Sequence, residues 1–368
     1  MTALIRPRLT DWTFVVPALA VVLLALTWGR DVSGITVAVV AAFLAGAVLA
    51  AVHHAEVVAH KVGEPYGSLV LAVAVTVIEV ALIVTLMISG GEKTQSLARD
   101  TVFAAVMITC NGILGLSLLI GALRRRVAVF NPEGTGGALA TVATLATLSM
   151  VVPNFTTARP GPQFSPAQLT FAAVASLALY LLFVMVQTGR HRDYFLPVTS
   201  DGSVVDADGD GHADPPSTRT ALASLGLLII SLVAVVGLAK TVSPAIEAGV
   251  AAANLPPAFV GVVIALLVLL PETLAAARAA RRDRVQISLN LALGSAMASI
   301  GLTIPAIAVA TIWLEGPLLL GLGGTQMTLL ALTAVTGVLT VVPGRATVLQ
   351  GGVHLVLLAA FVFLAASP

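Results

Sequence analysis

The chain has 368 residues, of which 58% are hydrophobic and only 10% are charged. A soluble domain of this length needs far more polar surface, so the composition predicts a membrane protein with many spans. The net charge of +1 gives no reason to expect a nucleic acid partner, and the single cysteine, Cys110, excludes an internal disulfide framework.

Apolar runs of about 20 residues, the length that crosses a bilayer as a helix, recur along the whole chain. We therefore predict an all-α polytopic membrane protein with about eleven transmembrane helices. The first run reads as a span, because it lacks the small-residue cleavage site of a signal peptide. The predicted spans are residues 11–29, 33–52, 67–89, 99–122, 136–152, 166–188, 220–241, 254–276, 286–312, 317–342 and 347–366.

The basic residues predict the orientation, because cytoplasmic loops of membrane proteins are rich in Lys and Arg. If the N-terminus is cytoplasmic, most of the 19 basic residues fall on the cytoplasmic side. An odd number of spans then places the C-terminus on the opposite side of the membrane.

A polar segment at residues 189–219 divides the spans into two groups. It is rich in Asp, Gly and Pro, so we predict a cytoplasmic acidic loop without a core of its own. If residues 1–32 form an extra first helix, five spans remain on each side of the loop, within 33–188 and 220–368. Five is an odd number, so the second group enters the membrane from the opposite side. This is the pattern of two inverted repeats, a common plan for secondary transporters.

Two carboxylates interrupt the apolar runs at matching places. Glu79 and Glu272 each lie in the second span of one five-span group. A charged side chain near the bilayer centre costs about 2.5–3.5 kcal/mol on insertion scales, so it must face the bundle interior, a partner or water. Two such acids can be neutralised by protons or by a divalent cation, and a site that takes either in competition is the minimal chemistry of an antiporter. Pro271, just before the second acid, can break its helix and free backbone carbonyls.

Neutral oxygen atoms lie close to both acids in the sequence. Asn111 follows in the next span of the first group, Ser295 and Ser299 follow in the next span of the second, and Thr76 precedes Glu79 by one turn. Amide and hydroxyl oxygens can complete the oxygen shell of a calcium ion. The alternative is that these residues only pack helices together or bond the backbone.

Several long strings resemble the calcium/cation antiporter superfamily, in particular its bacterial calcium/proton exchanger branch. The strings that resemble its two alpha-repeats are "GEPYGSLVLAVAVTVIEVALIV" with "RDTVFAAVMITCNGILG", and "LPETLAAARAARRDRVQISLNLALGSAMASIGLTIP". "HHAEVVAHKVGEPYG" and "RHRDYF" are similar to the same branch. The resemblance implies an inverted five-plus-five core with an extra first helix, with Glu79 and Glu272 as central acids and Asn111 and Ser295 as the polar positions of the partner helices. A Gly-Asn pair that often precedes the first acid is replaced here by Thr76.

Two further groups of polar residues carry hypotheses of their own. In "DADGDGHAD", Asp206, Asp208, Asp210 and Asp214 fit positions of an EF-hand calcium loop, which predicts a regulatory calcium site, although Ser217 stands where that loop has Glu. The alternative is a solvated acidic loop. A second group, which suits proton entry near neutral pH or a solvated helix end, is His53, Glu56, His60 and Glu64. His354, in the last span, has no evident partner in the sequence.

These observations together predict a calcium/proton antiporter of a bacterial inner (plasma) membrane that exports cytosolic calcium. Its partners would be calcium, protons and the lipid bilayer, without a cofactor beyond the transported ions. A sodium or potassium/proton antiporter using the same site is the near alternative. An intramembrane prenyltransferase-like enzyme would need a second Asp-rich cytoplasmic motif, which the sequence lacks, and a passive channel would not need titratable acids at a doubled site.

Overall fold

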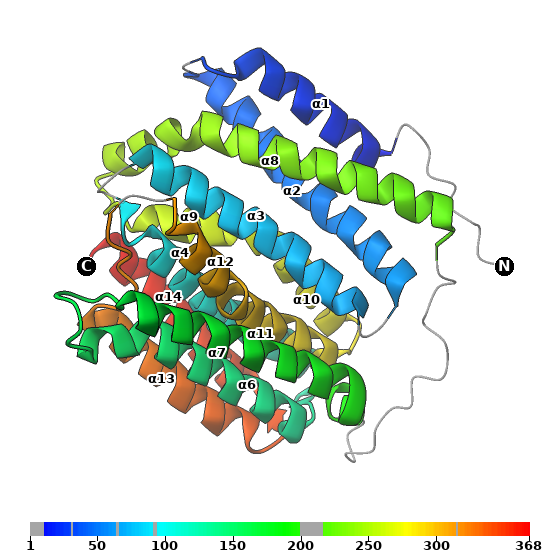
Figure 1. The fold of residues 1–368 in the computed structure, drawn as a ribbon. Helices are drawn as coiled ribbons and strands as arrows, with labels where there is room; N and C mark the ends of the chain where they lie inside the picture. Colours follow the sequence, from blue (N-terminus) through cyan, green and yellow to red (C-terminus); the bar gives the residue numbers. More distant parts are fainter. Residues whose placement is uncertain (1–10, 31, 64–65, 91–93, 199–215, 314–315) are drawn as a thin grey trace. The chain divides into compact units, whose positions relative to one another are not determined.

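The computed structural model describes residues 11–30, 32–63, 66–90, 94–198, 216–313 and 316–368, and these are almost entirely helical (Figure 1). The chain forms two compact units. Unit 1 contains Met1–Ser89 and Asp214–Gly249, and unit 2 contains Gly90–Ala213 and Val250–Pro368. Each unit therefore draws on both halves of the sequence.

Unit 1 is built from α1 (Trp12–Thr27), α2 (Ile35–Val62), α3 (Tyr66–Gly90) and α8 (Thr218–Ala252). His54 of α2 is buried, and its Nε2 donates to the carbonyl oxygen of Thr13 over 2.9 Å, which ties α1 to α2. On the α8 side, a Cβ on Gly237 would lie 2.4 Å from the Leu24 side chain. The first helix thus packs against both α2 and α8.

Unit 2 contains the remaining elements. The first half of the chain supplies α4 (Leu97–Met107), the π-helical turn η2 (Ile108–Ile113), α5 (Leu114–Arg125), α6 (Pro132–Ala146), η3 (Thr147–Val151), η4 (Val152–Phe155), α7 (Pro166–Met185), η5 (Val186–Arg190) and η6 (Arg192–Phe195). The second half supplies α9 (Phe259–Val268), α10 (Leu270–Arg281), α11 (Val285–Gly301), α12 (Thr303–Ala310), α13 (Gly324–Val341) and α14 (Val348–Ala366). A short antiparallel pair, β1 (Ala128–Val129) with β2 (Arg345–Ala346), joins the two halves.

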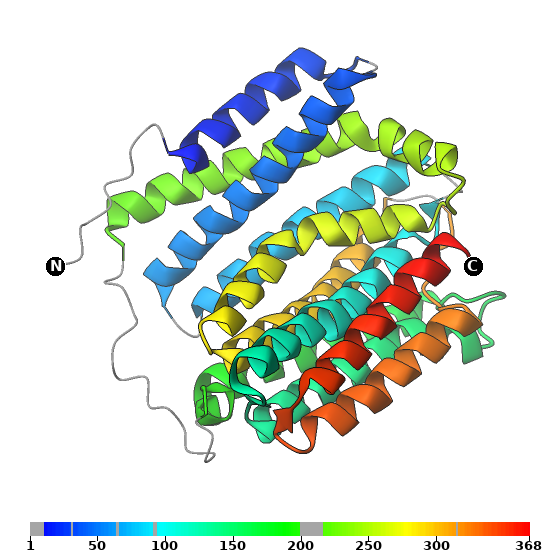
Figure 2. The same cartoon turned by 180° about the vertical axis from the view of Figure 1, so that it is seen from behind.

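The packing inside unit 2 brings helices from the two halves of the chain together. The last helix of the second half, α14, packs on α5 and η2, whereas the last helix of the first half, α7, packs on α11 and α12. The two fourth helices, α6 and α13, pack on one another. Figure 2 shows α14 in red beside α13 in orange.

Nine helices in the described part of the chain are long and apolar enough to cross a membrane, or ten if the bent pair Phe259–Val268 and Leu270–Arg281 forms one span. The first helix, Trp12–Thr27, has only 16 residues and is shorter than these. The all-α polytopic class is confirmed, and the count of eleven spans stays a prediction.

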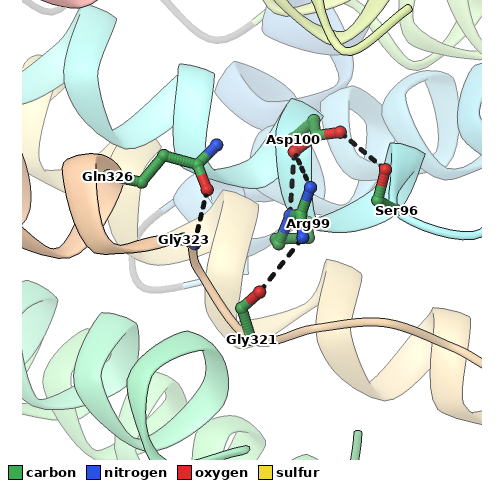
Figure 3. A network of polar contacts seen from close by, with 6 residues as sticks. All are labelled: Ser96, Arg99, Asp100, Gly321, Gly323 and Gln326. Atoms are coloured by element: carbon green, nitrogen blue, oxygen red, sulfur yellow. Dashed lines mark hydrogen bonds and ion pairs between the residues drawn. The ribbon is translucent and has the colours of Figure 1, made fainter. Parts of the chain in front are cut away.

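One end of unit 2 is fastened by an ion pair at the start of α4 (Figure 3). Arg99 contacts the carboxylate of buried Asp100 over 2.7 Å, and Ser96 donates to the other oxygen of that carboxylate over 2.9 Å. Arg99 also donates to the carbonyl oxygen of Gly321 over 3.1 Å. The loop before α13 is thus held against the start of α4.

Candidate cation site

The first predicted acid, Glu79, lies in unit 1, on the long apolar helix α3. Its side chain is only 2% exposed. Thr76 is one turn earlier on the same helix and is also buried. The structure thus gives Glu79 the buried environment in which a carboxylate needs a neutralising partner.

The second acid, Glu272, lies where its span is broken. The helices α9 and α10 meet at an angle of 54°, and the break falls at Leu269 (φ −86°, ψ 1°). Pro271 stands in the first turn of α10, which confirms the prediction of a broken helix. Because proline has no N–H, the carbonyl of Leu267 receives no bond from the residue four positions on. Glu272 itself sits in the first turn of α10, where the helix dipole favours a negative charge.

Asn111 is fully buried in the middle of a long span and lies in the π-helical turn η2. Its side-chain nitrogen donates to Thr333 of α13 over 2.9 Å, and its oxygen lies 3.1 Å from Nδ1 of His354 on α14. The sequence predicted neither the π-helical turn nor these contacts. Turns of this kind occur frequently at functional sites.

The elements that carry the predicted ligands of unit 2 are mutual neighbours. The helix α11, which carries Ser295 and buried Ser299, packs on both η2 and α10. Ser288 of α11 reinforces this contact by donating to the carbonyl oxygen of Ala276 on α10 over 2.8 Å, one turn after Glu272. Asn111, Glu272 and the two serines are therefore on packed elements. Glu79 and Thr76 belong to the other unit, and a site shared by both units stays a prediction.

The predicted proton-entry residues lie on one helix. His53, Glu56 and His60 are all exposed on α2, whereas Glu64 lies outside the described residues. His53 stacks at a tilt on Trp12, with ring centroids 6.3 Å apart. The predicted regulatory loop, with Asp206, Asp208, Asp210 and Asp214, also lies outside the described residues.

His354 has partners that the sequence did not reveal. It is 1% exposed and contacts Thr340 of α13 over 3.1 Å in addition to Asn111. The signal that was available is that polar side chains in apolar spans bond across helices. His354, Asn111, Thr333 and Thr340 each interrupt an apolar run, so they were candidates for one shared network.

A family model described as sodium/calcium exchanger protein matches residues 32–189 and 223–366. The chain belongs to this exchanger family. Members are transporters, so the exchanger is a cation transporter of many membrane spans and the enzyme alternative is excluded. The resemblance deduced from the sequence is confirmed.

Named relatives place the exchanger among bacterial ion transporters. It is 45% identical to "Putative ionic transporter y4hA" of Sinorhizobium fredii over 97% of the chain and 96% of the relative. It is 34% identical to "Sodium-potassium/proton antiporter ChaA" of Escherichia coli K12, again over 97% of the chain and 96% of the relative.

Two solved structures share the fold at low sequence identity. YfkE matches with a TM-score of 0.71 and 15% identity over 97% of the exchanger and 99% of YfkE. The H+/Ca2+ exchanger CAX matches with a TM-score of 0.66 and 14% identity over 98% of the exchanger and 92% of CAX. At these identities the likeness establishes the architecture alone.

Proposed function

We propose that the exchanger is a calcium/proton antiporter in which Glu79 and Glu272 bind calcium or protons in competition. The observation that carries this proposal is the placement of the two acids. One is buried in a long apolar helix, and the other stands at the N-terminal end of a half-helix after a break that frees a backbone carbonyl. Carboxylates with backbone, amide and hydroxyl oxygens are the ligands of hard cations, and carboxylates also carry protons.

The transport cycle follows from competition at these acids. In the outward-open state, protons bind to Glu79 and Glu272 and calcium leaves. The protonated acids are neutral, so the core rearranges without a buried charge. In the inward-open state, calcium binds while the protons leave to the cytosol. The proton gradient thereby drives export of cytosolic calcium across the inner membrane, with the N-terminus cytoplasmic and the C-terminus outside.

Sodium or potassium is the second candidate cation. The relative named as a sodium-potassium/proton antiporter shares 34% of residues over nearly the whole chain, whereas the calcium/proton antiporters YfkE and CAX share only the fold. A monovalent ion leaves one of two carboxylates uncompensated, which favours a divalent ion. The same two acids would serve either cation.

Proton movement in proteoliposomes tests the proposal. The purified exchanger is reconstituted with a pH-sensitive dye inside, an acid-inside gradient is imposed, and CaCl₂, NaCl or KCl is added outside. We expect calcium to alkalinise the interior, and we expect Glu79→Gln and Glu272→Gln to abolish the response, because an amide neither binds a proton nor carries charge. Glu133→Gln is the matched control, since Glu133 is exposed in the first turn of α6.

Each other outcome has a definite meaning. Calcium-driven proton movement that persists in Glu79→Gln or Glu272→Gln would contradict the proposal that these acids bind calcium and protons. A response to sodium or potassium but not calcium would assign the monovalent exchange. Cation flux without proton movement would support a channel and contradict coupling.

A further inference from the structure

Four buried polar side chains form a chain of hydrogen bonds inside unit 2. Asn111 of η2 contacts Thr333 of α13 and His354 of α14, and His354 contacts Thr340, two turns further along α13. All four residues are at most 3% exposed. Polar groups at this depth require hydrogen-bond partners, and here each finds them on a neighbouring helix.

One further atom favours a single direction for each bond in this chain of contacts. The thioether sulfur of Met107 lies 3.8 Å from the Asn111 side-chain nitrogen and 3.6 Å from the Thr333 hydroxyl. A thioether has no proton to give, so the amide group that faces it is the NH₂. The Asn111 oxygen therefore faces His354, whose Nδ1 must donate, and Nε2 of the neutral imidazole must then accept from Thr340.

Close helix packing is what lets His354 reach Asn111. A Cβ on Gly115, one turn after Asn111, would lie 2.8 Å from the Cβ of His354 and 3.1 Å from the carbonyl oxygen of Gly351. Only glycine permits this approach of α5 and α14. The fold thus places an imidazole against the side-chain oxygen of a residue in a π-helical turn.

We propose that His354 is a positioning residue for Asn111. By donating to the amide oxygen of Asn111, His354 keeps that oxygen, rather than the NH₂ group, available to the transported cation. An amide oxygen has two lone pairs, so it can accept from His354 and still face a cation. A flipped amide would present N–H hydrogens at the same place and repel the ion. This role rests on the proposed function, because it assigns Asn111 to the cation site.

Thr340 offers a test at the far end of this chain of contacts, because its side chain contacts His354 and not Asn111. Thr340→Val keeps the shape and removes the proton donor to Nε2. Without that donor the imidazole loses the bond that helps to hold it in place, so the hydrogen bond from its Nδ1 to the Asn111 oxygen weakens. Thr340→Ser restores the hydroxyl. Thr328→Val, on the exposed face of α13, is the control, since its hydroxyl bonds only the carbonyl of Gly324.

The measurements are the half-saturating cation concentration and maximal rate in proteoliposomes, with CaCl₂, NaCl and KCl each tried. We expect Thr340→Val to raise the half-saturating concentration about five- to tenfold. The maximal rate should change far less, and Thr340→Ser and Thr328→Val should match the parent chain. Cys110, the residue before Asn111, reports on these contacts independently: a membrane-permeant maleimide should modify it faster in Thr340→Val than in Thr328→Val.

The outcomes separate this proposal from the one it rests on. If the parent chain exchanges no cation, the proposed function fails. If the parent chain exchanges cations and Thr340→Val has the parent affinity, the positioning role of His354 is wrong, even where Cys110 becomes reactive. A loss of maximal rate at unchanged affinity, or an equal effect of Thr328→Val, would also overturn it.

Discussion

The crossing of α5 and α14 predicts opposite effects for two adjacent glycines. A Cβ on Gly351 would lie 2.8 Å from the backbone nitrogen of Leu119 and 3.0 Å from the carbonyl oxygen of Gly115. These are backbone atoms, so no side chain can rotate away and the two helices would have to separate. Nothing lies within 4 Å of a Cβ on Gly352, the next residue of the same helix.

The difference between Gly351→Ala and Gly352→Ala isolates this packing. Both variants gain the helix preference of alanine over glycine, about 0.8–1.0 kcal/mol, so that contribution cancels. Overpacking against immovable atoms costs roughly 1–3 kcal/mol. We therefore expect Gly351→Ala to be less stable than Gly352→Ala by about 1–3 kcal/mol, with Gly352→Ala at or slightly above the parent stability.

Thermal unfolding of the purified protein in detergent, followed by size-exclusion chromatography after heating, measures the difference. A difference of this size corresponds to several degrees in the midpoint, roughly 2–4 °C per kcal/mol for a chain of 150–250 residues. Equal midpoints for the two variants would show that α5 and α14 do not touch at Gly351, and the route by which His354 reaches Asn111 would be refuted with it.

Two further substitutions test other features of unit 2. Pro271→Ala restores an N–H that can bond the carbonyl of Leu267, so we expect α9 and α10 to straighten. The exchange rate in proteoliposomes should then fall at least about tenfold without loss of thermal stability. Exchange at the parent rate would contradict a role for the break. Gly134→Ala would place a Cβ 2.1 Å from the carbonyl oxygen of Tyr194, so we expect faster tryptic cleavage after Arg192. Gly137→Ala, with nothing within 4 Å of its Cβ, should behave as the parent chain. Equal cleavage of the two variants would show that the turn Arg192–Phe195 does not dock on α6.

The features that could be predicted from the sequence were those marked by a single acidic residue or proline within an apolar span. Glu79 and Glu272 stand out because a carboxylate in a membrane span needs a reason to be there. Pro271 predicted the broken helix, and the structure places the break two residues earlier, at Leu269. The family resemblance rested on the strings around these residues.

The features that escaped depend on geometry between segments. An apolar span lacks the amphipathic pattern from which a change of helical period could be read, so the π-helical turn around Asn111 left no signal. The partners of His354 lie 14 and 243 residues away in the chain, and only the packing of α13 and α14 on η2 brings them together. The first helix was predicted from hydrophobicity alone, and its 16 residues are fewer than a full span uses.

The composition of unit 1 has a consequence for how the chain is made. The helices α1, α2 and α3 leave the ribosome first, but α8, which completes the unit, begins only after unit 2 has received its first half. About 125 residues separate the two parts of unit 1, which at 5–20 residues per second is a wait of roughly 6–25 s. During that time the side chain of Leu24 has no Gly237 to pack against. In a nascent chain that is stalled before α8, unit 1 is incomplete. We therefore expect a membrane chaperone or a quality-control protease to bind that chain.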